Sequence, residues 1–554
     1  MADMTGGEAI ARTLLELGVS HVFGIVSVHN LPIYDAITRL GGIEPICARH
    51  EQNAVHMADG YARATGRLGV AIASTGPGCA NAVAGLYEAN AASSPVLLLT
   101  GQVETIYYGK GKGYLHEAEN QLAMLRTVTR RADTVRVAEE IPSTVHAVVR
   151  DILTGRPAPG AVEIPIDLQY ATVDHTIPAG FTPRPVVDEK ALRRGAEVLG
   201  GAARPVIWAG SGVVASGGSD ELVRLAERLG APVVTSIEGR GAMPEDHPLS
   251  LGPRTDRRAL AGVLGEADVL LAVGTRFFWQ DTVNWNVRLP SRIVHIDADN
   301  SVLNRNYRAE VAVQGDAKRA LQLLSDHLDT RSEGPPARCD AEFLARAQAA
   351  KADDDKVWEE QIGPDHWQIM DTLRSKLPRD AVIAKDTTLS AALWGNKLLP
   401  VLAPRTTMRP VAAAIGPGLP LALGAAVGVG KRTIVIHGDG GLMMSATELS
   451  TAAQHHVPLT TIVFNDGGYG VLRIIEESSF GRQNGVDLAT PDFAAMAESM
   501  GVPGRKASGV DEFDKALEWA FGQAGPNVID LDMRSLAPMQ FQYGGKRWPT
   551  VGRS

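Results

Sequence analysis

Two short glycine-rich segments place acidic residues where a cation and a phosphate group could be bound. Residues 438–441 read GDGG and residues 465–470 read NDGGYG, each at the end of an apolar run. A helix-like stretch separates them, which predicts a βαβ unit with two parallel strands. The carboxyl ends of such strands meet at one edge of the sheet, so we expect Asp439 and Asp466 to lie close together there.

Two carboxylates at one sheet edge form the hard oxygen site that Mg²⁺ or Ca²⁺ prefers. The glycines beside Asp439 would let backbone N–H groups approach a phosphate at the start of a helix. Together these features predict a diphosphate bound through a bridging cation. The alternative interpretation is that Asp439 and Asp466 only cap a helix and a turn.

A third acidic residue, Glu51, lies in residues 49–54 (RHEQNA), between a predicted strand and a predicted helix. The helix dipole favours a glutamate in the first turn, so Glu51 has a structural interpretation as well as a chemical one. Residues 385–390 (KDTTLS) also follow a predicted strand, at 381–384. Their hydroxyl groups suit either a phosphate contact or a simple helix cap.

The elements that must position these residues are short apolar runs bounded by Gly, Pro or Asp. Such runs are typical of buried parallel strands, so the predicted fold is α/β with doubly wound parallel sheets. Two polar, proline-containing stretches, 171–188 and 329–340, are predicted linkers. They divide the chain into domains at 1–170, 189–328 and 350–554. The predicted strands span residues 69–74, 96–100, 206–209, 269–273, 292–297, 434–437 and 460–465.

The first and last domains resemble each other in sequence pattern. Residues 76–78 and residues 416–418 both read GPG, and each is followed by a helix of small residues and then a strand. We therefore predict two copies of one α/β unit flanking a different middle domain.

Composition limits the possible functions of the 554-residue chain. A net charge of -9 disfavours a nucleic-acid partner, which needs a basic face. No apolar run reaches about 18 residues, so no membrane span is expected, and the N-terminus is not typical of a signal peptide. The three cysteines form no CxxC pair, which together with these features favours a cytoplasmic setting.

The two glycine-rich segments resemble the thiamine diphosphate-binding motif, which opens with GDG and closes with an Asn pair. The chain as a whole resembles the acetolactate synthase, pyruvate oxidase and benzoylformate decarboxylase family. Residues 29–35 (HNLPIYD), 63–66 (RATG) and 76–78 carry the likeness in the first domain. The resemblance implies an aminopyrimidine (PYR)-binding domain at 1–170, a Rossmann-like middle domain and a diphosphate (PP)-binding domain at 350–554.

The resemblance also implies a role for individual residues in binding thiamine diphosphate and Mg²⁺ (or Ca²⁺). The metal ligands would be Asp439, Asp466 and the carbonyl of Gly468, although most family members have Asn where this chain has Asp466. Glu51 would bind the aminopyrimidine ring and assist its proton transfers. The other cofactor-binding residues would be Thr387, Thr388, Ala413, Ile415, Gly438, Gly440, Gly441, Tyr469 and Gly470.

Ile415 would hold the two rings of the cofactor in a V shape, and the carbonyl of Ala413 would bind its amino group. Without the resemblance, Ile415 is equally interpretable as ordinary core.

Substrate chemistry is assigned to a polar loop and an apolar helix. His116 and Glu117 align with the Phe-Gln pair of acetolactate synthases and would transfer protons or bind a polar acceptor. The alternative is that both are solvated loop residues. The expected lining of the substrate pocket is Val28, His29, Val471, Leu472 and Ile475.

Several departures from the family limit the reactions that the chain can be expected to catalyse. Val28 stands where benzoylformate decarboxylase has its active-site serine, and its two catalytic histidines have no counterparts, which disfavours a plain decarboxylase. The middle domain has a GSG turn at 210–212 but lacks the segments that bind flavin. FAD is therefore expected to be absent.

The sequence predicts an enzyme that decarboxylates a pyruvate-like 2-oxo acid and joins the product to a second carbonyl compound. The first alternative is a decarboxylase, lyase or C–C hydrolase without carboligation. The second is a homologue that binds the cofactor without catalysis, which the joint presence of Glu51, Asp439, Asp466 and Ile415 disfavours. The family forms its site between subunits, so a homodimer would be the minimum active unit, and a homotetramer is common.

Overall fold

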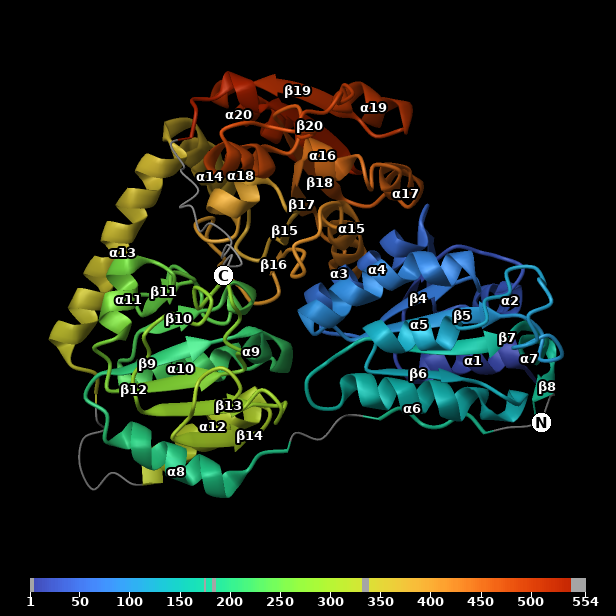
Figure 1. Cartoon of the computed structure of the whole chain (residues 1–554), viewed down its shortest axis with the longest axis horizontal. Coiled ribbons are helices and arrows are strands. Elements are labelled where there is room, and N and C mark those ends of the chain that lie inside the picture. Colours follow the sequence, from blue (N-terminus) through green and yellow to red (C-terminus); the bar gives the residue numbers. More distant parts are fainter. Residues whose placement is uncertain (1–3, 174–175, 182–185, 331–337, 540–554) are drawn as a thin grey trace, which may run out of the picture.

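The computed structural model describes residues 4–173, 176–181, 186–330 and 338–539. Its three domains each contain a six-stranded, wholly parallel sheet with helices on both faces, which confirms the predicted fold class. In Figure 1 the third domain lies at the top, the middle domain at the lower left and the first domain at the right. A two-stranded antiparallel pair, β1 (Met4–Thr5) with β8 (Thr172–Val173), joins the two ends of the first domain.

The sheet of the first domain has the order β3-β2-β4-β5-β7-β6. Its strands are β2 (His21–Gly24), β3 (Glu44–Cys47), β4 (Gly69–Ala73), β5 (Val96–Gln102), β6 (Arg131–Thr134) and β7 (Gly160–Pro165). Its helices are α1 (Gly6–Glu16), α2 (Leu31–Leu40), α3 (Glu51–Thr65), α4 (Pro77–Ala92), α5 (Gln121–Val128), α6 (Ile141–Leu153) and α7 (Ile166–Tyr170).

The middle domain has the order β11-β10-β9-β12-β13-β14, in which the first strand along the chain lies at the centre, as in dinucleotide-binding folds. Its strands are β9 (Pro205–Ala209), β10 (Val233–Thr235), β11 (Ser250–Gly252), β12 (Val269–Val273), β13 (Ile293–Asp297) and β14 (Val311–Gln314). Its helices are α8 (Glu189–Gly200), α9 (Ser211–Ser216), α10 (Ser219–Leu229), α11 (Arg258–Leu264) and α12 (Ala317–Thr330).

The third domain has the order β16-β15-β17-β18-β20-β19. Its strands are β15 (Ile383–Lys385), β16 (Thr407–Met408), β17 (Thr433–Gly438), β18 (Leu459–Asn465), β19 (Gly504–Ser508) and β20 (Asn527–Asp532). Its helices are α14 (Pro364–Lys376), α15 (Gly418–Val429), α16 (Asp439–Leu442), α17 (Glu448–Gln454), α18 (Gly470–Phe480), α19 (Phe493–Ser499) and α20 (Val510–Phe521).

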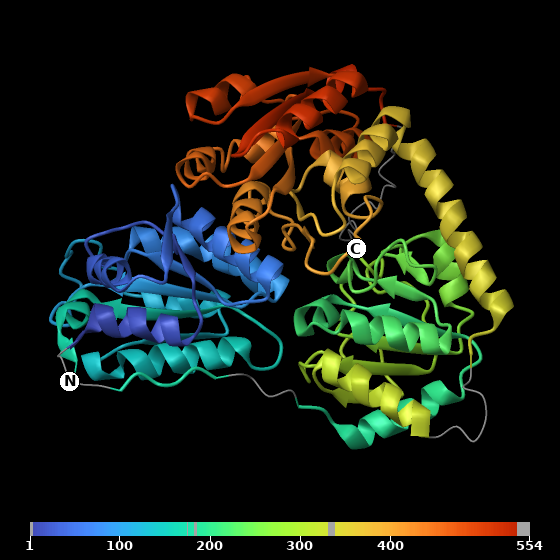
Figure 2. The same cartoon turned by 180° about the vertical axis from the view of Figure 1, so that it is seen from behind.

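A long helix, α13 (Ala341–Ile362), connects the middle and third domains along one edge of the molecule (Figures 1 and 2). Phe343 and Ala347 of this helix pack into the core of the middle domain, while Trp358 and Ile362 pack into the core of the third. Both predicted linkers include residues outside the described ranges. No described helix is long and apolar enough to cross a membrane.

The first and third sheets have the same strand order, so the predicted repeat of one α/β unit is confirmed. The predicted match between the two GPG turns is wrong by one βα unit. Residues 76–78 follow β4, the third strand of the first sheet, whereas residues 416–418 follow β16, the second strand of its copy. Asp439 therefore occupies the place of Gly76, and the start of α15 occupies the place of Glu51, the first residue of α3.

The equivalent helices α3 and α15 cross in close contact and join the first domain to the third (Figures 1 and 2). A Cβ atom at Gly60 would collide with the carbonyl oxygen of Leu421, and one at Gly424 with the carbonyl oxygen of Met57. Small residues thus let the two backbones touch. Since α15 is apolar on all sides and buried, the two domains share one hydrophobic core.

The close crossing predicts that one methyl group added between the two helices destabilises the protein. Gly424→Ala should lower the free energy of unfolding by about 1–3 kcal/mol, because the helices must separate. Gly262→Ala in α11 is the matched control, since its methyl group would meet no atom within 4 Å. The control should be neutral or stabilised by up to about 1 kcal/mol. Thermal unfolding of the two variants compares them, and equal stabilities would contradict the close crossing.

Candidate active site

The structure brings the carboxylates of Asp439 and Asp466 together at the carboxyl edge of the third sheet. The parallel ladder of β17 and β18 pairs Gly438 with Phe464, so the residues that follow both strands are neighbours. Burial raises the pKa of Asp439 above its ordinary value. Burial, followed by repulsion from Asp439, raises the pKa of Asp466 to about 6. Two buried acids that oppose each other's ionisation form a site that favours a cation.

The donor atoms of this site fit a divalent cation. Asp439 Oδ2 is buried and has no hydrogen-bond partner among the described residues. No cluster of three or more His, Cys, Asp or Glu that could hold a metal occurs in the part of the chain that the structure describes. The pair therefore needs a further oxygen ligand, and the predicted one is the carbonyl of Gly468. Carboxylate and carbonyl oxygens are the ligands that Mg²⁺ and Ca²⁺ take.

Arg473, which the sequence did not single out, supports the loop that carries Asp466. Its guanidinium lies 3.3 Å from Asp466 Oδ2 and donates to the carbonyls of Asp466 and Gly467 at 3.0 and 2.7 Å. A second ion pair, of 2.8 Å to Asp487, holds Arg473 from the other side. The carbonyls of Asp466 and Gly467 are thus engaged by Arg473.

The glycines of the two motifs are required by close packing. A Cβ atom at Gly438 or Gly440 would collide with the side chain of Thr388 or Tyr469, respectively. One at Gly441 would meet the carboxylate of Asp386, and one at Gly470 the carboxylate of Asp466. Because glycine has no side chain, the backbone at the start of the short helix α16 can pack this closely, and the predicted contact of its N–H groups with a diphosphate stays a prediction.

Asp386 fixes the segment that contains Ile415, and the sequence identified it only as part of a hydroxyl-rich turn. Its buried carboxylate accepts hydrogen bonds from the backbone N–H groups of Gly416 and Gly418 at 2.9–3.0 Å. Ala413, two residues before Ile415, has φ +61°, a left-handed conformation that costs energy for a residue with a Cβ. Ile415 and Thr387 are both half-buried. A strained loop held by a buried acid suits a ligand contact.

Glu51 is the first residue of α3, behind an N-cap at His50. Asn81 Nδ2 donates a 3.0 Å hydrogen bond to Glu51 Oε2, and Gly78 leaves space for the carboxylate because a Cβ there would lie 3.2 Å from Oε1. In one chain this carboxylate hydrogen-bonds within the first domain. The two domains meet nearby, where buried Glu448 accepts from Arg49 N at 3.1 Å and from Asn53 Nδ2 at 3.0 Å.

His116 lies beside Ser74, which borders the same glycine, Gly78, as Glu51. Its Nδ1 is 3.5 Å from Ser74 Oγ, and its ring centroid is 5.2 Å from that of His29. A Cβ at Gly78 would contact both Ser74 and Glu51, so these groups line one corner of the first domain. His116 has φ +61°. The imidazoles of His116 and His29 thus lie side by side, next to Ser74.

Glu117 points into its own loop rather than toward His116. Its carboxylate accepts backbone hydrogen bonds from Gly111 at 2.9 Å and Tyr114 at 3.1 Å, and such bonds lower its pKa. This geometry orders the loop, and a direct role for Glu117 in proton transfer stays a prediction.

The predicted pocket residues of the third domain lie on α18, a helix with no buried residue. Val471 and Ile475 are half-buried and Leu472 is exposed. In the first domain Val28 is exposed, whereas His29 is buried. Partly exposed apolar side chains on a helix beside the Asp466 loop are the surface expected of a pocket wall or an interface.

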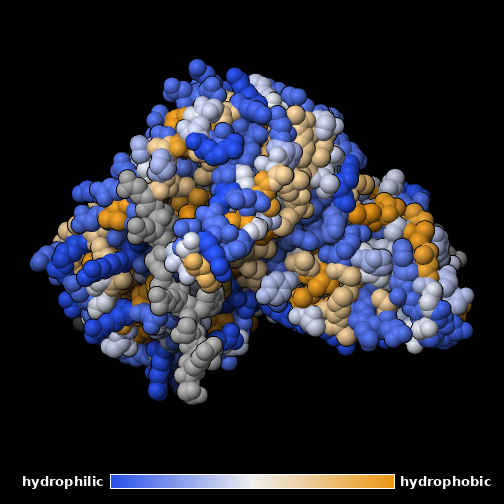
Figure 3. Space-filling view, turned by 45° about the horizontal axis from the view of Figure 1, so that its top comes forward, coloured by the Kyte–Doolittle hydropathy of each residue, from blue (hydrophilic) through white to orange (hydrophobic). Residues whose placement is uncertain are grey.

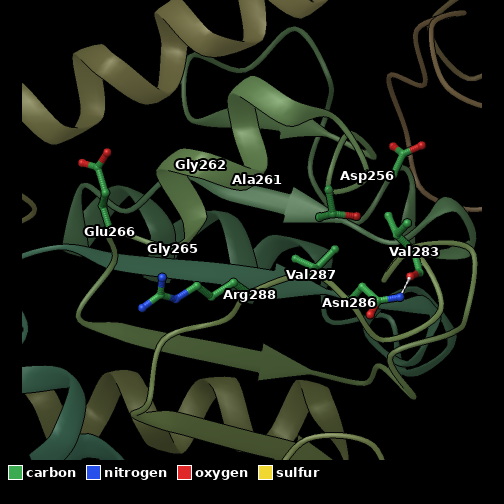
Figure 4. Close-up of a pocket in the computed structure, with 10 residues that line it drawn as sticks. Asp256, Ala261, Gly262, Gly265, Glu266, Val283, Asn286, Val287 and Arg288 are labelled. Atoms are coloured by element: carbon green, nitrogen blue, oxygen red, sulfur yellow. Dashed lines mark hydrogen bonds between the residues drawn. The ribbon is translucent and has the colours of Figure 1, made fainter.

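The middle domain contributes two further cavities. One of about 770 Å³ lies between all three domains and is lined by Gly212, Gly274 and Asp297, at the carboxyl ends of its strands, and by arginines such as Arg276. Burial lowers the pKa of Arg276 to about 10. The predicted absence of FAD from this domain stays a prediction. The other cavity, of about 520 Å³, lies between α11 and the loop around Asn286 (Figure 4).

Comparison with known proteins identifies the family. Residues 4–124 match the N-terminal TPP binding domain of thiamine pyrophosphate enzymes, residues 192–324 their central domain and residues 390–531 their C-terminal TPP binding domain. The chain belongs to the thiamine pyrophosphate enzyme family. The predicted resemblance to acetolactate synthases is thereby confirmed at the level of the family.

Relatives cover nearly the whole chain. A probable 2-ketoarginine decarboxylase of Pseudomonas aeruginosa is 35% identical over 95% of this chain and 94% of its own length. A probable acetolactate synthase large subunit of Methanocaldococcus jannaschii is 33% identical over 95% and 92%. The large subunit of acetolactate synthase isozyme 3 of Escherichia coli is 30% identical over 98% of both chains. The chain is therefore a thiamine diphosphate-dependent enzyme by family.

The carboxylate pair predicts that the metal-free protein becomes less stable as the pH rises. Because the pKa of Asp466 is raised from 3.8 to about 6, its contribution to stability is present at low pH and is lost as the pH rises through 6. Asp466→Asn should therefore raise the unfolding temperature of EDTA-treated protein above pH 6 and have little effect near pH 4. Asp487→Asn, which removes the exposed partner of Arg473, is the control. If Asp466→Asn unfolds at the same temperature as the wild type at every pH, the two carboxylates do not repel each other.

Proposed function

We propose that the enzyme decarboxylates a pyruvate-like 2-oxo acid and transfers the resulting acyl carbanion to a second carbonyl compound, as an acetolactate synthase-like carboligase. The observation that carries the proposal is the Asp439–Asp466 pair. The glycine-rich backbone of two motifs surrounds this pair, and the arrangement suits a diphosphate bound through a cation. Relatives named as acetolactate synthases, similar over nearly the whole chain, support the reaction class.

Bound thiamine diphosphate supplies the electron sink for the carbanion. Asp439, Asp466 and the Gly468 carbonyl would hold Mg²⁺, and the N–H groups of Gly440 and Gly441 would bind the diphosphate. Glu51 would hold a proton at the aminopyrimidine ring. Asn81 orients the carboxylate for this proton transfer.

Ile415 and Ala413 would orient the cofactor, because Asp386 fixes the backbone that follows them. Thr387 and Thr388 would contact the diphosphate, and Thr388 lies next to Gly438. His116 would move a proton to or from the reacting carbonyl oxygen. Val471, Leu472 and Ile475 would exclude water from the reacting atoms.

A second candidate is decarboxylation without carboligation, and the paired imidazoles favour it. Burial and the neighbouring His116 lower the pKa of His29. Two imidazoles at this distance can deliver a proton to a carbanion before a second carbonyl compound reaches it. One relative carries the name of a probable decarboxylase.

We propose a homodimer as the minimum active unit, with a homotetramer as a pair of dimers. Large apolar side chains stay exposed near both halves of the site: Val26, Val28, Leu31, Met443, Met444 and Leu472. Figure 3 shows hydrophobic patches on one face, including the first domain at the right. A partner chain would cover such residues and set its Glu51 opposite the Asp439 site. The three cysteines are free, which suits the reducing cytoplasm.

The reaction is tested by product analysis of the protein loaded with thiamine diphosphate and Mg²⁺. With pyruvate as the only substrate, the proposal predicts CO₂ release and a carboligated product in equal amounts. Release of CO₂ with free aldehyde alone would favour the second candidate. No consumption of pyruvate or of longer 2-oxo acids would refute both.

Glu51→Gln should leave cofactor affinity nearly unchanged and reduce turnover by at least about 10²-fold, the usual scale for a proton-transfer group. Glutamine keeps the size of the side chain and its hydrogen bond with Asn81 but cannot exchange a proton. Glu139→Gln, which removes an exposed glutamate of the same domain, is the control. Steady-state kinetics with calorimetric measurement of cofactor binding separates the two effects. Wild-type turnover in Glu51→Gln would show that the assigned role is wrong.

A further inference from the structure

An acid that the proposed mechanism does not use, the half-buried Glu104, lies at the carboxyl edge of the first sheet. Glu104 follows β5, Ser74 follows β4 and His29 follows β2. The strand order reverses between β2 and β4, and ligands of open α/β sheets bind outside the strand ends at such a point. Electrostatic interaction joins Glu104 to His29, whose ring neighbours His116. Glu104 therefore lies near the imidazole pair.

The Glu104 carboxylate is held in place by one oxygen and leaves the other without a partner. Tyr114 Oη donates to Oε1 at 2.9 Å. Oε2 is buried and has no hydrogen-bond partner among the described residues. The backbone is equally fixed, because the Glu104 carbonyl accepts from the N–H groups of Tyr107 and Tyr108 at 2.9 and 3.1 Å. A buried oxygen kept unpaired costs free energy, which a ligand with N–H donors would recover.

The groups around Glu104 suit a cation better than a neutral donor. His29 Nδ1 is also buried without a partner in the described chain, so this corner presents a second polar atom in need of one. Tyr107 and Tyr114 stack with ring centroids 4.3 Å apart, and the second of them bears the hydroxyl bound to Glu104. Carboxylate oxygens with tyrosine faces are the surroundings in which guanidinium and ammonium groups are bound.

We propose that Glu104 binds the positively charged end of the substrate side chain, so that the enzyme prefers 2-oxo acids ending in a guanidinium or ammonium group. The proposal rests on the proposed function and names its substrate class. The 2-oxo acid group would lie beside Glu51 and His116, and the side chain would extend past His29 toward Glu104. Tyr114 acts as a positioning residue that orients the carboxylate.

The test compares two 2-oxo acids of similar length, 5-guanidino-2-oxopentanoate and 2-oxohexanoate, with wild-type protein and Glu104→Gln. Glutamine keeps the bond from Tyr114 but lacks the charge. The wild type should have the higher kcat/KM for the guanidino acid. The variant should lose at least about tenfold of that preference, the scale of one charge-assisted hydrogen bond, mainly through KM. Glu119→Gln removes an exposed charge from the same loop and should keep the wild-type preference.

Calorimetric binding of both acids to the cofactor-free protein separates this proposal from the proposed function. Tighter binding of the guanidino acid that Glu104→Gln abolishes, with neither acid converted, would support the substrate class and refute the proposed reaction. Conversion of both acids with no preference, or a preference that survives Glu104→Gln in a variant that unfolds like the wild type, would overturn the substrate class alone.

Discussion

The crossing of α3 and α15 is the contact on which the rest of the site depends. Gly60 and Gly424 bring the two backbones together, so the first and third domains pack as one hydrophobic body rather than as separate units. Glu51 begins one of these helices, and the segment containing Ile415 leads directly into the other. Because both helices are fixed at their crossing, their N-termini are fixed as well. The middle domain has cores of its own and is attached through α13.

Electrostatic repulsion makes the Asp439–Asp466 pair favourable for binding a cation. Asp439 and Asp466 are held together by two parallel strands, and burial denies them the solvent that would screen their charges. A divalent cation would remove this cost and offer its remaining positions to a diphosphate. The carboxylate of Asp466 supplies half of this repulsion, and the guanidinium of Arg473 offsets part of it.

Sequence periodicity predicted the sheets well because a strand buried on both faces is a continuous apolar run. The Asp439–Asp466 pairing was predictable for a related reason: a βαβ connection fixes where both strands end. Periodicity could not place residues 416–418 in the repeat, since GPG turns look alike after any strand. It also missed Asp386, whose carboxylate accepts from Gly416 and Gly418, 30 and 32 residues further along the chain. The Glu117 carboxylate accepts hydrogen bonds from its own loop. The local sequence would look the same if this side chain pointed into solvent.

The most direct test of the account is calorimetric titration of thiamine diphosphate into metal-stripped wild-type protein, with and without Mg²⁺. The account predicts binding that requires the cation, because the diphosphate reaches Asp439 and Asp466 only through it. Equal affinity in the presence and absence of Mg²⁺ would contradict the metal site. Absence of binding under both conditions would show that the chain keeps the family's fold without its cofactor chemistry.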